Sequence, residues 1–344
     1  MEKYRKFADS FTGKNPCLPA YANAKKMSIG QFLTHWIPGI ILLIVKLPFL
    51  LLSILGLFLY FQIIQKIIIV PSLRRIFDNI TVKINSRILL GLFGFFSLPG
   101  NLRLQQNLFK MHGQPIFSNH TSPIDILYLM AMMNPVFVRM NYQADQQKVQ
   151  FEKFQFLDIL KLIFKRDYIV SQNEINEKSQ PLEKIMASAK KNNEGPVLIF
   201  YEGCNNNGQG VLKCPQILLQ QILDNSQNIK GQQFVALNIQ YKRKDQFSPI
   251  NTVRNQFWHL VLLLSTFSNS VKILAKFIQI PGNLKIKELE QSFEGFYKGC
   301  GQSVLDLDFN NYVKFLEFWF ISSSKNSKYV KEVKTEKVGQ RYVQ

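Results

Sequence analysis

The apolar pattern is most pronounced near the amino terminus, where Ile37–Phe61 is almost uninterrupted by charge. Lys46 is the single charged side chain in this run of twenty-five residues. As a helix the run would be about 37 Å long, enough to cross the hydrocarbon core of a bilayer and long for a buried core helix. Pro38 and Pro48 interrupt it. Two geometries stay open, a single kinked crossing and a re-entrant hairpin bent near Pro48.

A second helical pattern follows over Ser72–Leu98. It opens with two arginines, continues with isoleucines at helical spacing, and becomes wholly apolar toward its end. Basic residues beside an apolar face are typical of a helix that lies in the headgroup layer of a membrane. The Pro-Gly-Asn sequence from Pro99 should end it. We therefore predict a polar segment over residues 1–36, then membrane-embedded and interfacial helices over residues 37–98.

From Leu102 onward the pattern changes to short apolar strands that alternate with helical segments. Such alternation predicts an α/β fold with a mixed, mainly parallel sheet flanked by helices on both faces. We assign residues 99–308 to this domain. The predicted strands are Leu102–Phe109, Pro115–Phe117, Pro135–Met140, Tyr168–Val170, Val197–Tyr201, Phe234–Tyr241 and Val271–Ile280. The predicted helices are Ile126–Met133, Phe154–Phe164, Pro181–Lys191, Ile217–Leu223 and Ile286–Leu305.

The last part of the chain, residues 309–344, combines an aromatic segment with a basic tail. Phe309–Ile321 is rich in Phe and Tyr and contains Trp319. It is too short to span a bilayer, so we expect either an interfacial helix or a helix that packs on the domain.

Charge and composition narrow the choice of partners. The net charge is +19 with 47% hydrophobic residues. The basic residues are spread along the chain without a nucleic-acid-binding motif, so anionic lipid headgroups or an anionic substrate explain them better than nucleic acid does. The four cysteines and four histidines lack the spacing of a metal site. We expect free thiols in a reducing compartment.

The stretch Asn119–Asp125 is the best candidate for chemistry, because it joins a predicted strand to a predicted helix. Ser122 suits the N-cap, Pro123 suits the first helical position, and Asp125 is the acid of a capping box. His120 lies just outside the helix start, where its imidazole can meet the Asp125 carboxylate and remove a proton from a hydroxyl. The alternative is that Asp125 only caps the helix and His120 is a polar loop residue.

A second polar loop follows the strand that ends at Tyr201. It begins with Glu202 and Gly203, continues through three asparagines to Gly208, and Lys213 comes shortly after. Ligands of α/β sheets sit beyond the carboxyl ends of strands, and both polar loops have that position. Taken alone, this second loop would be read as a solvated turn.

Together these stretches resemble the glycerolipid acyltransferases, in particular the lysophosphatidylcholine acyltransferase group. Residues 119–125 match the whole of that family's first motif, Asn-His-x-Ser-x-x-Asp. Residues 200–208 resemble the third motif, with Tyr201 in place of a proline and Cys204 in place of a threonine, and Lys213 falls where the group has a lysine. The similarity extends over nearly the whole chain.

The resemblance implies a reaction and roles for the matching residues. His120 would be the general base that takes the proton of a glycerol hydroxyl, and Asp125 would orient the imidazole. The hydroxyl would attack an acyl-CoA thioester, with no cofactor, no metal and no covalent enzyme intermediate. Glu202 and Gly203 would help to bind the acceptor, together with Asn119 and Ser122 of the first motif. The helix start after Ser122 would offer N–H groups to an anionic oxygen.

The chain departs from the family where the acceptor phosphate should bind. The second motif, Gly-x-x-Phe-Ile-x-Arg, aligns best with Lys165–Ser171, so that Ser171 replaces the arginine. A phosphate site without this guanidinium loses both charge and bidentate geometry. Arg139 and Lys213 are among the cations that could replace it. The fourth motif resembles Phe234–Tyr241, with Ala236 in place of its usual proline.

Two functions fit these observations. The first is a membrane-bound enzyme that acylates a lysophospholipid from acyl-CoA, favoured by the joint presence of His120 and Asp125. The second is a weakly active or inactive subunit with the same fold, which scaffolds or holds lipid in a membrane protein complex. The departures at Ser171, Tyr201 and Ala236 favour that alternative. The resemblance implies the endoplasmic reticulum, with a mitochondrial membrane as the alternative.

Overall fold

The structure is a computed structural model of the whole chain. It describes residues 2–19, 29–97, 107–108, 110–143, 148–155, 158–159, 163, 170–171, 178–228, 233–243, 245–253, 255–279 and 285–323.

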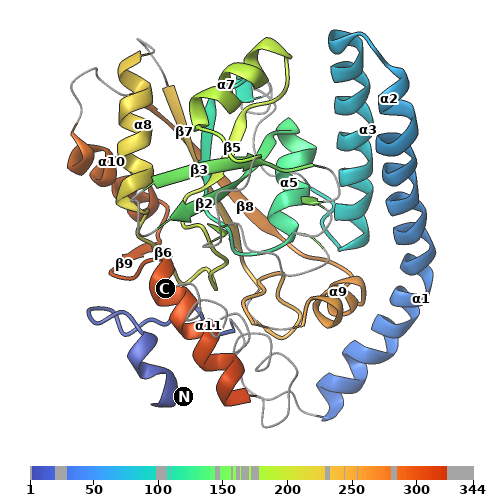
Figure 1. Cartoon of the computed structure of the whole chain (residues 1–344). Coiled ribbons are helices and arrows are strands. Elements are labelled where there is room, and N and C mark those ends of the chain that lie inside the picture. Colours follow the sequence, from blue (N-terminus) through green and yellow to red (C-terminus); the bar gives the residue numbers. More distant parts are fainter. Residues whose placement is uncertain are drawn as a thin grey trace, which may run out of the picture.

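A mixed sheet forms the centre of the molecule, as Figure 1 shows. Its strand order is β3-β2-β5-β1-β7-β8, and β4 pairs with β2. The pairs β5–β1, β1–β7, β2–β5 and β2–β4 are parallel, whereas β2–β3 and β7–β8 are antiparallel. The predicted mixed, mainly parallel sheet is therefore confirmed. The strands are β1 (Pro115–Ser118), β2 (Val136–Gln143), β3 (Lys148–Lys153), β4 (Val170–Ser171), β5 (Val197–Phe200), β7 (Gln233–Tyr241) and β8 (Val271–Gln279).

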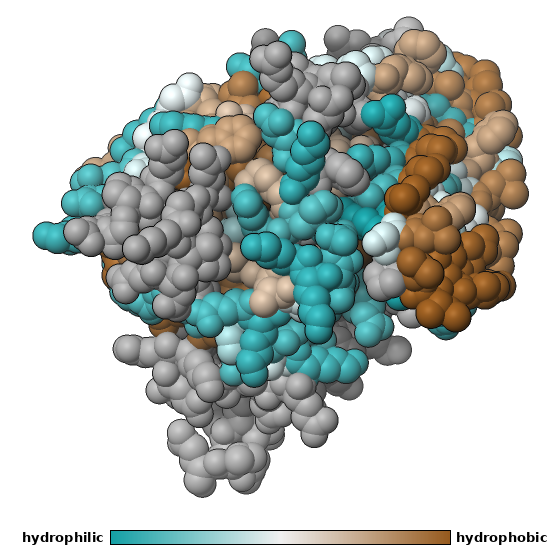
Figure 2. Space-filling view, turned by 90° about the horizontal axis from the view of Figure 1, so that it is seen from above, coloured by the Kyte–Doolittle hydropathy of each residue, from teal (hydrophilic) through white to brown (hydrophobic). Residues whose placement is uncertain are grey.

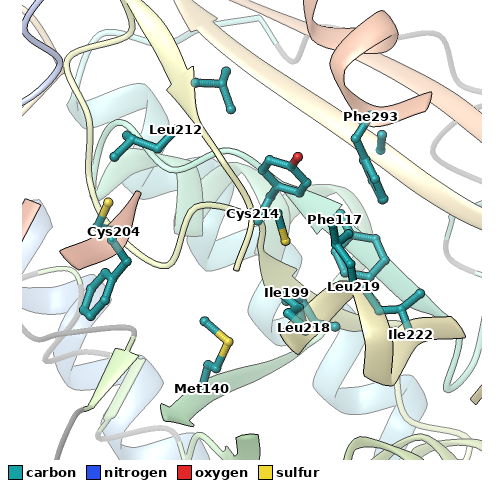
Figure 3. Close-up of a cluster of buried hydrophobic side chains, with 14 of the residues drawn as sticks. Phe117, Met140, Ile199, Cys204, Leu212, Cys214, Leu218, Leu219, Ile222 and Phe293 are labelled. Carbon is teal, nitrogen blue, oxygen red and sulfur yellow. The ribbon is translucent and has the colours of Figure 1, made fainter. Parts of the chain in front are cut away.

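Helices cover both faces of this sheet, because neighbouring residues of each central strand point to opposite sides. In β1, Phe117 belongs to one buried cluster and Ile116 to the other. The cluster around Phe117 packs against α8 (Gln216–Asn228) and α10 (Ile286–Gly299), as the side chains in Figure 3 show, and also includes α7 (Leu182–Lys191). The cluster around Ile116 packs against α5 (Ile124–Met133) and α9 (Gln256–Leu264).

The amino-terminal apolar run forms one side of a long helical hairpin. The helix α1 (Ile29–Leu59) runs without a break through both prolines, and a π-helical turn, Tyr60–Ile64, leads into α2 (Gln65–Ile67). The chain then reverses, and α3 (Pro71–Leu92) returns beside α1 and packs on α5 (Figure 1). Among the described helices, residues 36–67 are long and apolar enough to cross a membrane by length and composition.

This hairpin corrects two expectations. A bend near Pro48 was one of the two predicted geometries, but the reversal comes directly before Pro71, where Ile68 is already extended. A proline is favoured in the first turn of a helix, since its missing N–H is not needed there. The second helix also ends earlier than the Pro99 signal indicated, because Gly94 adopts φ +83° and takes the chain out of the helix.

Three other predicted elements differ from the structure at described positions. The helix predicted over Ile286–Leu305 ends at Gly299, because Gly301 adopts φ +82° and the chain enters β9 (Ser303–Leu305), which pairs in parallel with β6 (Gly210–Leu212). Residues 107 and 108, expected in a strand, are helical. Of the helix predicted over Phe154–Phe164, residues 158, 159 and 163 are helical, but Phe154 lies outside a helix and its N–H donates to the Phe137 carbonyl. The rest of Leu102–Phe109, most of Phe154–Phe164, and Tyr168–Ile169 lie outside the described residues.

The carboxy-terminal aromatic segment is α11 (Phe309–Ser323). We predicted either an interfacial helix or a helix that packs on the domain, and its described side chains pack on the domain. Phe315 is fully buried, and its ring contacts Tyr4 and Phe7 of the amino-terminal 3-10 helix Glu2–Phe7. We call residues 2–19 the N-terminal strap, because they connect α11 with the loop after β5.

Candidate active site

Three loops meet at the carboxyl ends of the adjacent parallel strands β5, β1 and β7. They are the β1 loop, residues 119–123, the β5 loop, residues 201–209, and the β7 loop, residues 242–255. The backbone N–H of Asn206 donates to the His120 carbonyl, and that of Asn251 donates to the Thr121 carbonyl. The edge beyond strand carboxyl ends is where ligands of such sheets bind. The sequence predicted the β1 and β5 loops at this edge, and the structure adds the β7 loop to them.

The Asp125 carboxylate is the best-satisfied group of this site. Its Oδ2 accepts hydrogen bonds from the backbone N–H of Thr121 (2.7 Å), the backbone N–H of Ser122 (2.9 Å) and Nδ1 of His120 (3.2 Å). Its Oδ1 accepts a hydrogen bond from the Tyr241 hydroxyl (2.5 Å). The side chain is completely buried. Four donors thus satisfy both oxygens of one buried carboxylate.

His120 is fixed by this carboxylate in one orientation. Since an ionised carboxylate can only accept, Nδ1 carries a proton and Nε2 is the atom that can accept another. Nε2 has no hydrogen-bond partner among the described residues. The ring packs on Phe200, with centroids 4.3 Å apart, and His120 is only 2% exposed. The structure thus pairs the imidazole and the acid in the form that a general base needs, in a site closed from bulk solvent.

Asn119 and Ser122 hold the β1 loop against its neighbours. The Asn119 side chain accepts from the backbone N–H of Ile239 (2.7 Å) and donates to the carbonyl of the same residue (3.0 Å). The Ser122 hydroxyl donates to the Pro249 carbonyl (2.6 Å) and accepts from the N–H of Ile124 (3.1 Å). Both polar side chains are therefore engaged by the protein itself.

The start of α5 differs in part from the predicted capping box. Asp125 reaches back to the N–H of Ser122, as that motif requires, but the Ser122 hydroxyl caps Ile124. The N–H of Asp125 donates to the Ser122 carbonyl. The N–H groups of Thr121, Ser122, Ile124 and Asp125 are thus all occupied. The free N–H groups that we expected at this helix start, as a site for an anionic oxygen, are not available at these four positions.

Glu202 is a second buried acid, on the β5 loop. Its Oε2 accepts hydrogen bonds from the Leu212 N–H (2.8 Å) and from the Asn206 side chain. Its Oε1 is buried without a hydrogen-bond partner among the described residues. Burial raises the pKa of the Glu202 carboxyl to about 8, against the hydrogen bonds from Leu212 and Asn206, which act to lower it. Gly203 follows with φ +69° and turns the chain.

The N-terminal strap supports the β5 loop from outside. The Asn207 side chain donates to the carbonyls of Asn15 (2.8 Å) and Leu18 (2.9 Å), and its backbone N–H donates to Pro16. At the other end of the strap, Asp9 accepts from the N–H of Asp306 (2.7 Å). The loop that carries Glu202 is therefore held by a segment nearly two hundred positions away.

The two cations proposed for the acceptor phosphate have other partners. The Lys213 ammonium lies 2.7 Å from a carboxylate oxygen of Asp306, at the surface. The Arg139 guanidinium lies over the ring of Phe154, 5.1 Å from its centroid. Neither forms a hydrogen bond or ion pair with His120 or Asp125. Most of the aligned second motif, Lys165–Ser171, lies outside the described residues. No group of three His, Cys, Asp or Glu among the described residues could hold a metal ion.

Sequence reasoning missed the contribution of β7 and its loop. Tyr241 binds Asp125, the Pro249 carbonyl binds Ser122, and Asn251 binds Thr121. The available signal was the predicted strand Phe234–Tyr241, which ends in a tyrosine. Nothing in the sequence showed that this strand lies next to β1.

Comparisons with known proteins give a structural likeness but no sequence match. No family model and no curated protein matches the chain. The crystal structure of the 1-acyl-sn-glycerophosphate (LPA) acyltransferase PlsC from Thermotoga maritima is similar with a TM-score of 0.44 and 15% sequence identity. The match covers 75% of this chain and 95% of that one. A likeness at this level carries no weight for the activity, which we infer from the residues of this chain.

Proposed function

We propose that the protein is a membrane-associated acyltransferase, which moves an acyl chain from acyl-CoA to a free glycerol hydroxyl of a lysophospholipid. The observation that carries this proposal is the buried pair of His120 and Asp125, in which Nδ1 is paired and Nε2 is left for a substrate. The match of residues 119–125 to an acyltransferase motif supports it. The proposal requires no cofactor, and acyl-CoA is the second substrate.

The proposed reaction follows from this pair. Nε2 of His120 takes the proton of the acceptor hydroxyl while the oxygen attacks the carbonyl carbon of the thioester. Asp125 stabilises the imidazolium that forms. When the tetrahedral intermediate collapses, the carbon–sulfur bond breaks, and the proton on Nε2 passes to the departing sulfur. The acyl chain ends on the glycerol oxygen, the coenzyme leaves as a thiol, and His120 returns to its starting form.

The acceptor would bind beside the β5 loop. Glu202 lies within the electrostatic reach of Asp125 and its unpaired Oε1 is buried. A neutral Glu202 can donate a hydrogen bond to an acceptor oxygen, whereas an ionised one can accept from a hydroxyl. We propose the glycerol part of the lysophospholipid as its partner, with Gly203 leaving room at the turn.

The direct test measures acyl-CoA consumption by the purified protein with a panel of lysophospholipids. We expect His120→Ala to lower the rate by about a thousandfold or more. His112→Ala is the matched control, because His112 lies at the opposite end of β1, where its ring contacts the Glu194 carbonyl. A wild-type rate no higher than that of His120→Ala would remove the proposal.

We also propose that the membrane partner binds the helical hairpin. The outer face of α3 exposes Ile76, Ile80, Ile84 and Ile88, and hydrophobic surface gathers at the right of Figure 2, where Figure 1 places α1 to α3. Since α3 packs on α5 with its other side, lipid can reach the hairpin from one side only. A hairpin that lies along one leaflet fits this arrangement better than a helix surrounded by lipid.

Tryptophan fluorescence tests this orientation. Trp258 of α9 is about half exposed and stacks on Trp36, whereas Trp319 of α11 packs on Tyr4. Aromatic side chains at such positions are typical of the membrane interface. In variants with a single tryptophan, we expect brominated lipids to quench Trp258 strongly and Trp319 weakly. Equal quenching at both positions would contradict the proposed orientation.

A second function is supported by the closure of the site. His120 is only 2% exposed and packs on Phe200, so a substrate must displace neighbouring residues to reach Nε2. A protein that scaffolds a membrane complex, or holds a lipid without turnover, needs no such opening. Stable co-purification with other membrane proteins from native membranes, combined with no turnover, would favour this function. Turnover by a monomer would exclude it.

A further inference from the structure

The end of β7 holds the His120 motif at both of its ends. The backbone of Ile239 makes two hydrogen bonds with the side chain of Asn119, the first residue of the motif. Two residues later, the Tyr241 hydroxyl donates to Asp125, the last residue of the motif. The first contact is made by the backbone of β7 and the second by a side chain, and both come from its last three residues. This strand end therefore contacts both the first and the last residue of the motif that contains His120.

The hydrogen bond from Tyr241 differs from the other hydrogen bonds of Asp125, because no second described donor contacts the same carboxylate oxygen. Oδ2 of the carboxylate has three donors, but the Tyr241 hydroxyl is the single described donor to Oδ1. Asp125 is fully buried and Tyr241 is 5% exposed. Loss of this hydroxyl would leave one oxygen of a buried carboxylate without a partner, which is unfavourable.

We propose that Tyr241 is a positioning residue for acyl transfer, which holds the Asp125 carboxylate in place and limits how strongly it attracts the proton of the His120 imidazole. This inference rests on the proposed function. A donor on Oδ1 draws negative charge toward that oxygen and away from Oδ2, the atom that faces Nδ1. The strength of the contact between Oδ2 and the Nδ1 proton therefore depends on the Tyr241 hydroxyl.

Removal of the hydroxyl has a defined consequence. In Tyr241→Phe the carboxylate interacts more strongly with the imidazolium, so His120 stays protonated to a higher pH. We expect the acid limb of the pH–rate profile to move up by about half to one pH unit. At a fixed pH on this acid limb we expect kcat to fall by about three- to tenfold with KM nearly unchanged, since the lost contact acts on the base and not on substrate binding.

The chain offers a matched control in Tyr128. Its hydroxyl is also buried, but has no hydrogen-bond partner among the described residues, and it lies on α5, one turn after Asp125. Both tyrosine rings pack edge-on against Phe95, with centroid distances of 5.4 Å for Tyr128 and 5.9 Å for Tyr241. Tyr128→Phe thus removes the same atom from the same aromatic cluster without removing a contact of Asp125.

The experiment compares wild type, Tyr241→Phe and Tyr128→Phe in pH–rate profiles, and follows the titration of the His120 imidazole by nitrogen NMR, assigned with His120→Ala. We expect the upward shift in Tyr241→Phe alone. A Tyr241→Phe profile and titration equal to wild type would overturn the inference, and so would an equal shift in both variants. Turnover is not needed for the NMR readout. If the His120 titration shifts in Tyr241→Phe but the wild-type protein shows no turnover, the proposed function is rejected. The effect of Tyr241 on the His120–Asp125 pair would still be supported.

Discussion

Asp125 and Glu202 are two buried acids at neighbouring strand ends, and they differ in how well their carboxylate oxygens are hydrogen-bonded. Both oxygens of Asp125 accept hydrogen bonds, from four donors in all. Glu202 accepts two hydrogen bonds of good geometry, both on Oε2, while Oε1 has none among the described residues. The backbone N–H of His120 is near enough to act with them in lowering the pKa of Glu202. The same edge of one sheet therefore holds an acid with both oxygens hydrogen-bonded and an acid that burial drives toward the neutral form. Environments that separate two acids in this way are a usual basis for assigning different roles.

Local backbone geometry explains the difference. Asp125 lies in the first turn of a helix, where the N–H groups of the preceding residues converge on its side chain. Glu202 follows the end of a strand, where the N–H groups point along the sheet and not at the side chain. Its donors come from Asn206 and Leu212, further along the chain. A helix start thus supplies several donors at once, while a strand end depends on what folds back over it.

The largest expected difference is in catalysis. Asp125→Asn places an amide where four donors require a carboxylate, so we expect a loss of about a thousandfold in kcat. Glu202→Gln keeps the size of the side chain and resembles its neutral form, and we expect a loss at least tenfold smaller than that of Asp125→Asn. Rates of the two purified variants, measured at the same pH, decide the matter. Equal losses would mean that Glu202 also acts as a carboxylate.

The next effect concerns stability and pH. The pKa of Glu202 is about 8 in the folded protein and its ordinary value is 4.5, so the unfolded chain loses this proton first. The stabilising contribution is complete below the ordinary value and is lost as the pH rises through the folded value. Relative to Glu202→Gln, the wild type should lose up to about 1.4 kcal/mol per pH unit across this window.

This pH effect can be measured by thermal unfolding of both proteins in detergent, at about pH 5 and about pH 8. On going from the lower to the higher pH, the melting temperature of the glutamine variant should rise relative to that of the wild type. A constant difference between the two proteins would show that Glu202 is ionised throughout this window. In that case the contrast between the two acids would disappear.

The smallest expected effect concerns the hydrogen bonds that hold each of the two loops in place. Asn207→Ala removes the two side-chain hydrogen bonds to the N-terminal strap and keeps the backbone bond to Pro16, and we expect a loss of about 1 to 3 kcal/mol in unfolding free energy. Ser122→Ala removes the contact of the β1 loop with Pro249 and should cost a similar amount. We expect the pH dependence described for Glu202 to change in Asn207→Ala only. A change in both variants would show that the loops are coupled.

The sequence was sufficient for the features that depend on close neighbours. His120 and Asp125 are five positions apart, and the geometry of a helix start brings them together, so the pair could be predicted. The alternation of strands and helices likewise indicated the central strands, because each is buried on both faces and reads as an apolar run. The apolar run at the amino terminus was long enough to be recognised as a helix.

The features that were missed depend on contacts between distant positions. Tyr241 follows Asp125 by 116 positions, and their contact exists because β7 pairs with β1, which no local pattern specifies. The N-terminal strap was read as a polar segment, since its contact with Asn207 depends on where the whole domain places residues 15–18. Pro48 was considered as a bend, but a proline inside an apolar helix can be accommodated without a break.

The attachment of the N-terminal strap has a consequence for synthesis at the ribosome. The N-terminal strap must wait for Phe309–Ser323, because Tyr4 and Phe7 pack on α11. The hydrophobic hairpin emerges long before that and can reach a lipid surface while translation continues. The nascent chain would then be tethered to the membrane with both its leading residues and its Glu202 loop unfinished. The packing of residues 2–19 is thus completed only after α11 has been synthesised.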